Sequence, residues 1–331
     1  MAKISILMGV YNEAAYLPAA IESVLTQTHE DLEFIVVDDA STDDSVDVVR
    51  SYDDPRIILL ENETNRGLTV SLNRALSEAT GELVARQDAD DVSEPDRLAR
   101  QVAFLERNPS VAVVGTGAHL IDGDGTVLDT RIAYCNPTFE DFMATGHLIH
   151  GSILARRSVL EEVGGYDEFF RYAQDQELWL RLTDAGYEIA NIPDPLYLHR
   201  IHDEGVYFSR KDESAMYSKI ARDLVTGACD RADLETLEEA GLLAYYDRLS
   251  PERRASFHAD LATRYLRYGH TGPALDECAN AREYRPYAPG LLALSVLARL
   301  GPRAIDPVRW GMRRYLNAKT RLLNRFACPY R

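Results

Sequence analysis

Residues 4–43 read ISILMGVYNEAAYLPAAIESVLTQTHEDLEFIVVDDASTD, and this stretch decides the fold. It opens on a short apolar run, Ile4–Val10, which has the length and the flanks of a buried strand. Apolar residues then recur at helical spacing over Leu17–Gln27, and a second apolar run follows at Leu32–Val37. Strand, helix and strand in this order predict a βαβ unit with two parallel strands.

The alternation of strand and helix continues beyond this unit. We expect further strands at Arg56–Leu60, Glu82–Arg86 and Val111–Gly115, and further helices at Ser45–Tyr52, Leu68–Ala79 and Pro95–Arg107. The pattern predicts an α/β domain with a parallel sheet, in which ligands bind at the carboxyl ends of the strands. The next segment is mixed, with strands expected at Ile153–Arg156, Tyr187–Ile192 and Leu196–Ile201 and helices at Ser158–Val163 and Asp175–Ala185.

Charge and cysteine usage narrow the class of protein. The 331-residue chain has 53 acidic and 36 basic residues, a formal net charge of −17. The segment Leu297–Arg331 has nine basic residues and one acid, so it carries +8 and the rest of the chain −25. This large negative net charge argues against a general nucleic-acid-binding protein. Four scattered cysteines predict neither a disulfide framework nor a zinc site, and favour a cytoplasmic setting.

The strongest chemical signal is Asp88-Ala89-Asp90, which directly follows the strand expected at Glu82–Arg86. Alternate residues of an extended segment point the same way, so both carboxylates can face one ligand. Two carboxylates with an open coordination shell suit Mg²⁺ or Mn²⁺ bound against a diphosphate. A solvated acidic turn is the alternative interpretation. The position at a strand end, shared with Glu13 and Asp39, favours a binding site.

Asp175 is the second candidate, because it stands at the start of an apolar helix. It has the position of a helix N-cap, and capping alone is one interpretation. A general base facing a cleft is the other, since the helix dipole favours the ionised carboxylate that a base needs. If Asp175 is only a cap, Asp91 is the next candidate for the base. His202 follows an expected strand, and from the sequence pattern alone it is either a structural histidine or a ligand.

Taken together, the motifs resemble family 2 glycosyltransferases of the GT-A fold, over roughly Lys3–Ser209. Besides residues 4–43, the matching stretches are NRGLTVSLNRAL (65–76), GELVARQDADD (81–91), VGGYDE (163–168), AQDQELWLRL (173–182) and LHRIHDEGVYFS (198–209). The resemblance implies transfer of a sugar from a nucleotide diphosphate sugar to an acceptor, with inversion at the anomeric carbon. Lipid-linked acceptors are common in the family.

The resemblance also assigns roles to single residues. It implies that Asp39 accepts a hydrogen bond from the base, usually uracil, and that Asp175 is the catalytic base. The remaining assignments are Tyr11, Glu13, Arg66 and Asp88 for the nucleotide sugar, and Asp88, Asp90 and His202 for Mg²⁺ or Mn²⁺. Two positions depart from the family pattern. Gln174 replaces the acid that usually precedes the base, and Gly9 replaces a proline of the first strand-to-loop turn.

The expected fold is therefore a GT-A catalytic domain at 1–213 with a helical extension at 214–331. The extension contains a tetratricopeptide-like hairpin at about 255–300. Its basic, amphipathic tail at about 305–331 either contacts an anionic membrane surface or packs on the acidic catalytic domain. We expect a UDP-sugar donor and a glycan or lipid-linked acceptor. The alternatives are a sugar-phosphate nucleotidyltransferase and a non-catalytic scaffold that binds nucleotide sugars.

Overall fold

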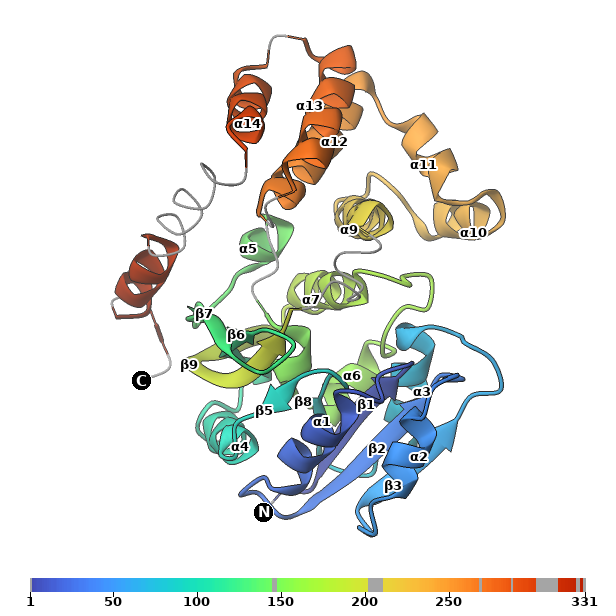
Figure 1. The fold of residues 1–331 in the computed structure, drawn as a ribbon, viewed down its shortest axis with the longest axis vertical. Helices are drawn as coiled ribbons and strands as arrows, with labels where there is room; N and C mark the ends of the chain where they lie inside the picture. Colours follow the sequence, from blue (N-terminus) through green and yellow to red (C-terminus); the bar gives the residue numbers. More distant parts are fainter. Residues whose placement is uncertain are drawn as a thin grey trace. The chain divides into compact units, whose positions relative to one another are not determined.

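The computed structural model describes residues 2–144, 148–201, 211–267, 270–286, 288–301, 315–325 and 328–329 (Figure 1). Contacts between residues divide the chain into two compact units. The first unit comprises Met1–Asp203 together with Thr320–Arg331, and the second comprises Glu204–Lys319. The end of the chain therefore belongs with the N-terminal unit rather than with the helical extension. None of the helices in these ranges is long and apolar enough to cross a membrane.

One mixed sheet organises the first unit. Its strands are β1 (Ile4–Val10), β2 (Leu32–Asp38), β3 (Ile57–Glu61), β4 (Leu83–Arg86), β5 (Val92–Ser93), β6 (Val111–Ile121), β7 (Val127–Arg131), β8 (Leu154–Arg156) and β9 (Glu188–Arg200). The order is β3-β2-β1-β4-β8-β6-β9-β5, with β7 paired to β6. The first four strands in this order are parallel, as the alternating pattern predicts, whereas β8 runs antiparallel to both of its neighbours.

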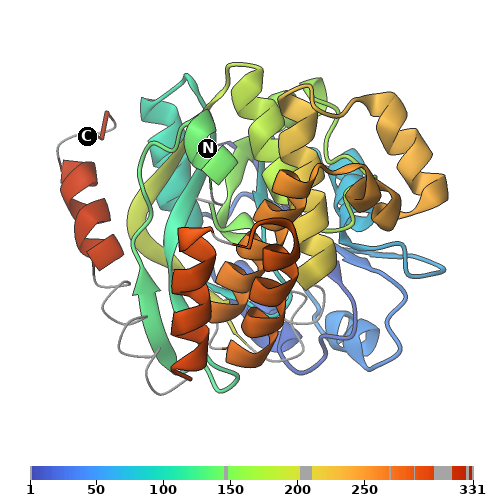
Figure 2. The ribbon, with the colours of Figure 1, turned by 90° about the horizontal axis from the view of Figure 1, so that it is seen from above.

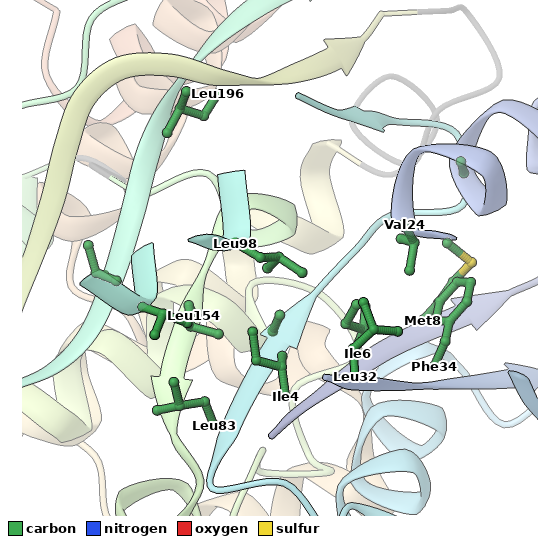
Figure 3. Close-up of a cluster of buried hydrophobic side chains, with 14 of the residues drawn as sticks. Ile4, Ile6, Met8, Val24, Leu32, Phe34, Leu83, Leu98, Leu154 and Leu196 are labelled. Atoms are coloured by element: carbon green, nitrogen blue, oxygen red, sulfur yellow. The ribbon is translucent and has the colours of Figure 1, made fainter. Parts of the chain in front are cut away.

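Helices cover both faces of this sheet. They are α1 (Leu17–Leu25), α2 (Ser45–Arg50), α3 (Leu68–Glu78), α4 (Arg97–Arg107), α5 (Phe139–Ala144), α6 (Arg157–Glu162) and α7 (Gln174–Asp184), with a short 3₁₀ turn at His150–Ser152. Alternate side chains of β1 and β2, among them Ile6 and Phe34, point to the same core as Val24 of α1 and Leu98 of α4 (Figure 3). Because strands buried on both faces need apolar residues throughout, these strands appear in the sequence as continuous apolar runs.

Two strands expected from the sequence are one in the structure. The sequence predicts separate strands at Tyr187–Ile192 and Leu196–Ile201, but β9 is continuous from Glu188 to Arg200. Its pairing with β6 shifts register at Gly117, which lies opposite Pro195. A Cβ atom on Gly117 would stand 2.6 Å from the carbonyl oxygen of Pro193, so only glycine fits this irregularity. The proline-containing segment is thus a bulge within one strand.

The second unit is helical in its described residues. Its helices are α9 (Lys211–Val225), α10 (Arg231–Ala240), α11 (Leu242–Arg248), α12 (Pro251–Arg267), α13 (Thr271–Tyr284) and α14 (Pro289–Arg299). The last three, drawn in orange to red-orange in Figure 2, pack against one another. Ala262, Ala274 and Ala281 are fully buried, and such small side chains let α12 and α13 approach closely. A further helix, at residues 315–325, follows near the end of the chain.

Candidate active site

The candidate site begins where three parallel strands end at one edge of the sheet. In the register of the sheet, Val10 at the end of β1 pairs with Asp38, and Leu7 pairs with Arg86 at the end of β4. The turns that follow therefore lie side by side, and they carry the acidic residues singled out in the sequence. This is the edge at which open α/β sheets bind ligands.

Asp39 follows β2 and fastens the loop that leads into α3. Its Oδ1 accepts hydrogen bonds from Asn62 Nδ2 at 2.7 Å and from the backbone N–H of Arg66 at 2.9 Å. Its Oδ2 accepts one from the N–H of Gly67 at 2.7 Å. A carboxylate offers about four acceptor positions, so this arrangement leaves one for a ligand donor such as the N–H of a base. Arg66 is thereby held at the site through its backbone.

Tyr11 and Glu13 lie in the turn after β1, which is joined to the turn after β2. Asn12 between them has φ 57°, and its Oδ1 accepts a hydrogen bond from the N–H of Thr42 at 2.7 Å. The N–H of Glu13 donates to Ser45 Oγ at 3.0 Å. Tyr11 remains 46% exposed. Its ring therefore offers an aromatic surface beside the loops that Asp39 organises.

Asp88 stands at the end of β4 and is held from two sides. Its carboxylate forms an ion pair with the guanidinium of Arg86, and its N–H donates to Tyr197 Oη at 3.1 Å. Gly151 lies next to this carboxylate, and a Cβ atom on Gly151 would stand 2.5 Å from Asp88 Oδ2. The absence of a side chain at Gly151 thus leaves the space that this carboxylate occupies.

Asp91 anchors the acidic turn instead of serving as an exposed base. Its side chain is fully buried; Oδ1 accepts from the N–H of Arg200 at 2.6 Å, and Oδ2 lies 3.0 Å from His199 Nδ1. Although burial opposes charge on the imidazole, the acidic neighbours, Asp91 first, raise the pKa of His199 to about 9. Arg200 Nε also donates to the carbonyl oxygen of Asp90 at 2.7 Å. These contacts from β9 make Asp91 unsuitable as the alternative base, because both of its oxygens are engaged.

Asp175 lies in the first turn of α7, not at its N-cap. The helix begins at Gln174, and the N-cap residue is Ala173, whose φ of 58° is left-handed. Capping, one of the two interpretations of Asp175 from the sequence, is therefore wrong, and the carboxylate of Asp175 is half-buried. Burial raises the pKa of Asp175, whereas backbone hydrogen bonding and Arg86 oppose the rise. A carboxylate with a raised pKa is a stronger base while it remains ionised at neutral pH.

Aromatic side chains and a half-buried imidazole, which the sequence pattern does not reveal as a group, lie close to these carboxylates. His150 Nε2 lies 2.8 Å from Tyr166 Oη, and its ring meets that of Trp179 edge to face at 6.0 Å. Burial, together with the charge of Arg86, holds the pKa of His150 well below its usual value, so the imidazole is neutral. Burial raises the pKa of Tyr166, and the charges of Asp175 and Asp88 raise it further. The phenol therefore stays protonated.

The donor set at the acidic turn fits a divalent cation that prefers oxygen. Asp88 keeps 28% of its side chain exposed, and Asp90 is half-buried. Two carboxylates with phosphate oxygens of a substrate form a usual environment for Mg²⁺. Within the described ranges, no group of three His, Cys, Asp or Glu side chains is placed to hold a metal. His202, the third expected ligand, lies outside the described residues.

Comparison with solved structures identifies the fold. The structure of S. aureus TarS 1–349 in complex with UDP matches with a TM-score of 0.57 at 17% identity, over 90% of this chain and 91% of that chain. Mannosyltransferase PcManGT from Pyrobaculum calidifontis, in complex with GDP-Man and Mn²⁺, matches with a TM-score of 0.58 at 19% identity, over 98% and 87%. The fold is that of GT-A glycosyltransferases, which confirms the expected fold class.

Comparison of sequences then gives the family. Residues 5–164 match the sequence profile described as Glycosyl transferase family 2. The chain is 38% identical over 269 residues to the "Putative glycosyltransferase EpsE" of Bacillus subtilis (strain 168). The matched region covers 80% of this chain and 92% of EpsE. It is 31% identical over 206 residues to the "Putative teichuronic acid biosynthesis glycosyltransferase TuaG" of the same organism, over 61% and 81%. The chain belongs to glycosyl transferase family 2 and is a glycosyltransferase.

Proposed function

We propose that this glycosyltransferase moves a sugar from a nucleotide diphosphate sugar to a hydroxyl or phosphate of a glycan or lipid-linked acceptor, with inversion. A UDP-sugar is the favoured donor, and assembly of a cell-surface glycan in the cytoplasm is the favoured setting. The observation that carries this proposal is the neighbourhood shared by Asp88 and Asp175. They come from separate parts of the chain, the turn after β4 and helix α7, yet both act electrostatically on Tyr166, and both experience the charge of Arg86.

The two carboxylates have separate tasks in the proposed reaction. Asp175 accepts the proton of the acceptor hydroxyl, whose oxygen then forms a bond to the anomeric carbon. The bond from that carbon to the diphosphate breaks on the opposite face of the sugar, which inverts the configuration. Asp88, Asp90 and His202 would hold Mg²⁺ or Mn²⁺, which supplies positive charge to the diphosphate oxygens.

The remaining residues of the site bind the nucleotide and hold the carboxylates in place. The unused acceptor position on Asp39 suits the N–H of a pyrimidine base, and Tyr11 offers an exposed ring next to it. Glu13 and Arg66 lie in the loops that contain Tyr11 and that Asp39 holds in place. Arg86 pairs with Asp88 and its positive charge also acts on Asp175, which lowers the cost of placing two carboxylates near each other.

A panel of isotope-labelled nucleotide sugars tests the proposal. Purified protein is incubated with each donor, with Mn²⁺ or Mg²⁺, and with a membrane lipid extract or glycan fragments as acceptors. We expect label from one donor, a UDP-sugar, to appear in an acceptor, and the transfer to stop with EDTA. Release of a sugar 1-phosphate into solution without acceptor labelling would instead indicate a different reaction. Transfer that is insensitive to EDTA would contradict the metal assignment.

A further inference from the structure

The helix at residues 315–325 packs through its polar side and exposes its apolar side. Half-buried positions occur at Asn317, Thr320 and Asn324, which share one face because they are three and four residues apart. The opposite face is formed by Tyr315, Leu316, Lys319, Leu322 and Leu323, and its four apolar side chains are 65%, 49%, 59% and 38% exposed in chain order. A helix that serves only to pack in a globular protein would bury this face instead.

Asn324 explains why the polar side faces inward. Its Oδ1 accepts a hydrogen bond from the N–H of Cys135 at 3.0 Å, and its Nδ2 donates to the carbonyl oxygen of Ala133 at 2.8 Å. Both ends of the amide are thus used on one backbone segment of the first unit. The orientation of the helix is therefore fixed by specific polar contacts.

We propose that the face formed by Tyr315, Leu316, Lys319, Leu322 and Leu323 binds the surface of an anionic lipid membrane. The charge of the helix selects this occupant. Lys319 lies in the middle of the face, Arg321 and Arg325 lie on its exposed flank, and residues 315–325 contain no acid. A short helix with leucines and an aromatic on one face, and only basic charges, binds the interface of anionic bilayers.

Leu322 and Leu323 lie in Thr320–Arg331, which belongs to the first unit, so binding through these two side chains attaches the catalytic unit itself to the lipid surface. Residues 1–296 carry −25 and would be repelled by an anionic surface. The helix therefore supplies both the local attraction and a defined side of approach. Vesicle binding of this kind does not depend on the proposed sugar transfer, so the two proposals can fail separately.

Sedimentation with vesicles tests this inference on the full chain. Vesicles of phosphatidylcholine with an equal part of phosphatidylglycerol are compared with vesicles of phosphatidylcholine alone. We expect the protein to sediment with the anionic vesicles and to be released by added salt. The double variant Leu322→Ser/Leu323→Ser should bind the anionic vesicles at least roughly tenfold more weakly than the wild type. Arg321→Gln/Arg325→Gln should lose roughly fivefold for each charge removed.

The matched control is Leu243→Ser/Leu292→Ser, which removes two leucines that are 76% and 47% exposed on α11 and α14. This control should bind vesicles like the wild type. Thermal unfolding and UDP binding are measured on each variant, and both should be unchanged because the altered side chains lie on the surface. Equal vesicle binding by wild type and Leu322→Ser/Leu323→Ser would overturn the inference. So would a wild-type dimer in solution that this variant dissociates, since a second copy would then occupy the face.

Discussion

The guanidinium of Arg86 forms an ion pair with the carboxylate of Asp88, two residues further along the chain. The Arg86 side chain is 3% exposed, whereas that of Asp88 is 28% exposed. A buried positive charge at the end of β4 thus holds a carboxylate at the surface of the site. Together with the contacts of Tyr197 and Gly151, this pair orients Asp88 before any ligand binds.

Replacing Arg86 should destabilise the protein more than breaking an exposed ion pair does. Arg86→Gln leaves Asp88 and Asp175 without their shared positive neighbour, and we expect a loss of about 3 kcal/mol in the free energy of unfolding. Arg86→Lys should recover part of this loss because it keeps the charge. Urea unfolding measures the effect. The control is Arg50→Gln, which breaks an exposed pair with Glu61 and should cost less than about 1 kcal/mol.

A methyl group at Gly151 should displace Asp88. The Cβ atom of Gly151→Ala would collide with Asp88 Oδ2 and with the phenol of Tyr197. We therefore expect kcat/KM for sugar transfer to fall about tenfold or more, since small displacements of reacting groups are costly. Gly272→Ala is the matched control, because a Cβ atom there meets nothing within 4 Å. If both variants transfer sugar at the wild-type rate, the position of Asp88 does not matter for the reaction.

Asp39→Ala should weaken binding of the free nucleotide. Loss of one charge-assisted hydrogen bond corresponds to about 1.5–3 kcal/mol, or roughly 10- to 150-fold in the dissociation constant of UDP. Calorimetry gives that constant. Asn62→Ala separates the two possible causes, because it removes one support of the loop and leaves the carboxylate in place. Equal losses in both variants would show that Asp39 acts only by holding the loop.

The parallel strands and most helices follow from local sequence patterns, whereas the environment of the site does not. Continuous apolar runs locate β1, β2 and β4 because a buried strand needs such residues locally. The acidic turns can be located as well, because they follow these strands directly in the sequence. The supports from β9, His199 and Arg200, approach Asp91 from more than a hundred residues away. A local pattern of apolar residues does not predict contacts between residues so far apart in the sequence.

Two further residues show the same limit. His150 and Tyr166 come together only after the chain between α5 and α7 has folded, and neither stands in a motif that marks such a pair. The stretch VGGYDE belongs to the family resemblance, yet the sequence alone assigns no contact to its tyrosine. Helix α7 begins one residue before the start that the sequence predicts, because the left-handed Ala173 takes the N-cap position without a capping side chain.

The stability of the first unit should depend on pH through Glu33. Burial alone would raise the pKa of Glu33, but hydrogen bonds from Lys3, Ser5 and Thr80 lower it to about 2. The folded protein therefore favours the ionised form. The resulting stabilisation is present above the ordinary pKa of a glutamate, near 4.5, and is lost as the pH falls toward 2.

Glu33→Gln tests this dependence. We expect the variant to be about 1–3 kcal/mol less stable than the wild type at neutral pH, with the difference shrinking as the pH falls below about 4.5. Urea unfolding across this pH range measures both proteins. A difference that stays constant with pH would mean that the loss comes from packing and not from charge.

The variant Asp175→Asn shows whether Asp175 is the base of the sugar transfer. The change keeps the shape of the side chain and removes its basicity. Transfer rate and nucleotide-sugar affinity are measured on the same preparation. We predict that the transfer rate falls by about 10²–10⁴-fold, while the dissociation constant of the donor stays within a factor of about three. A transfer rate close to that of the wild type would contradict the account, as would a parallel loss of affinity and rate.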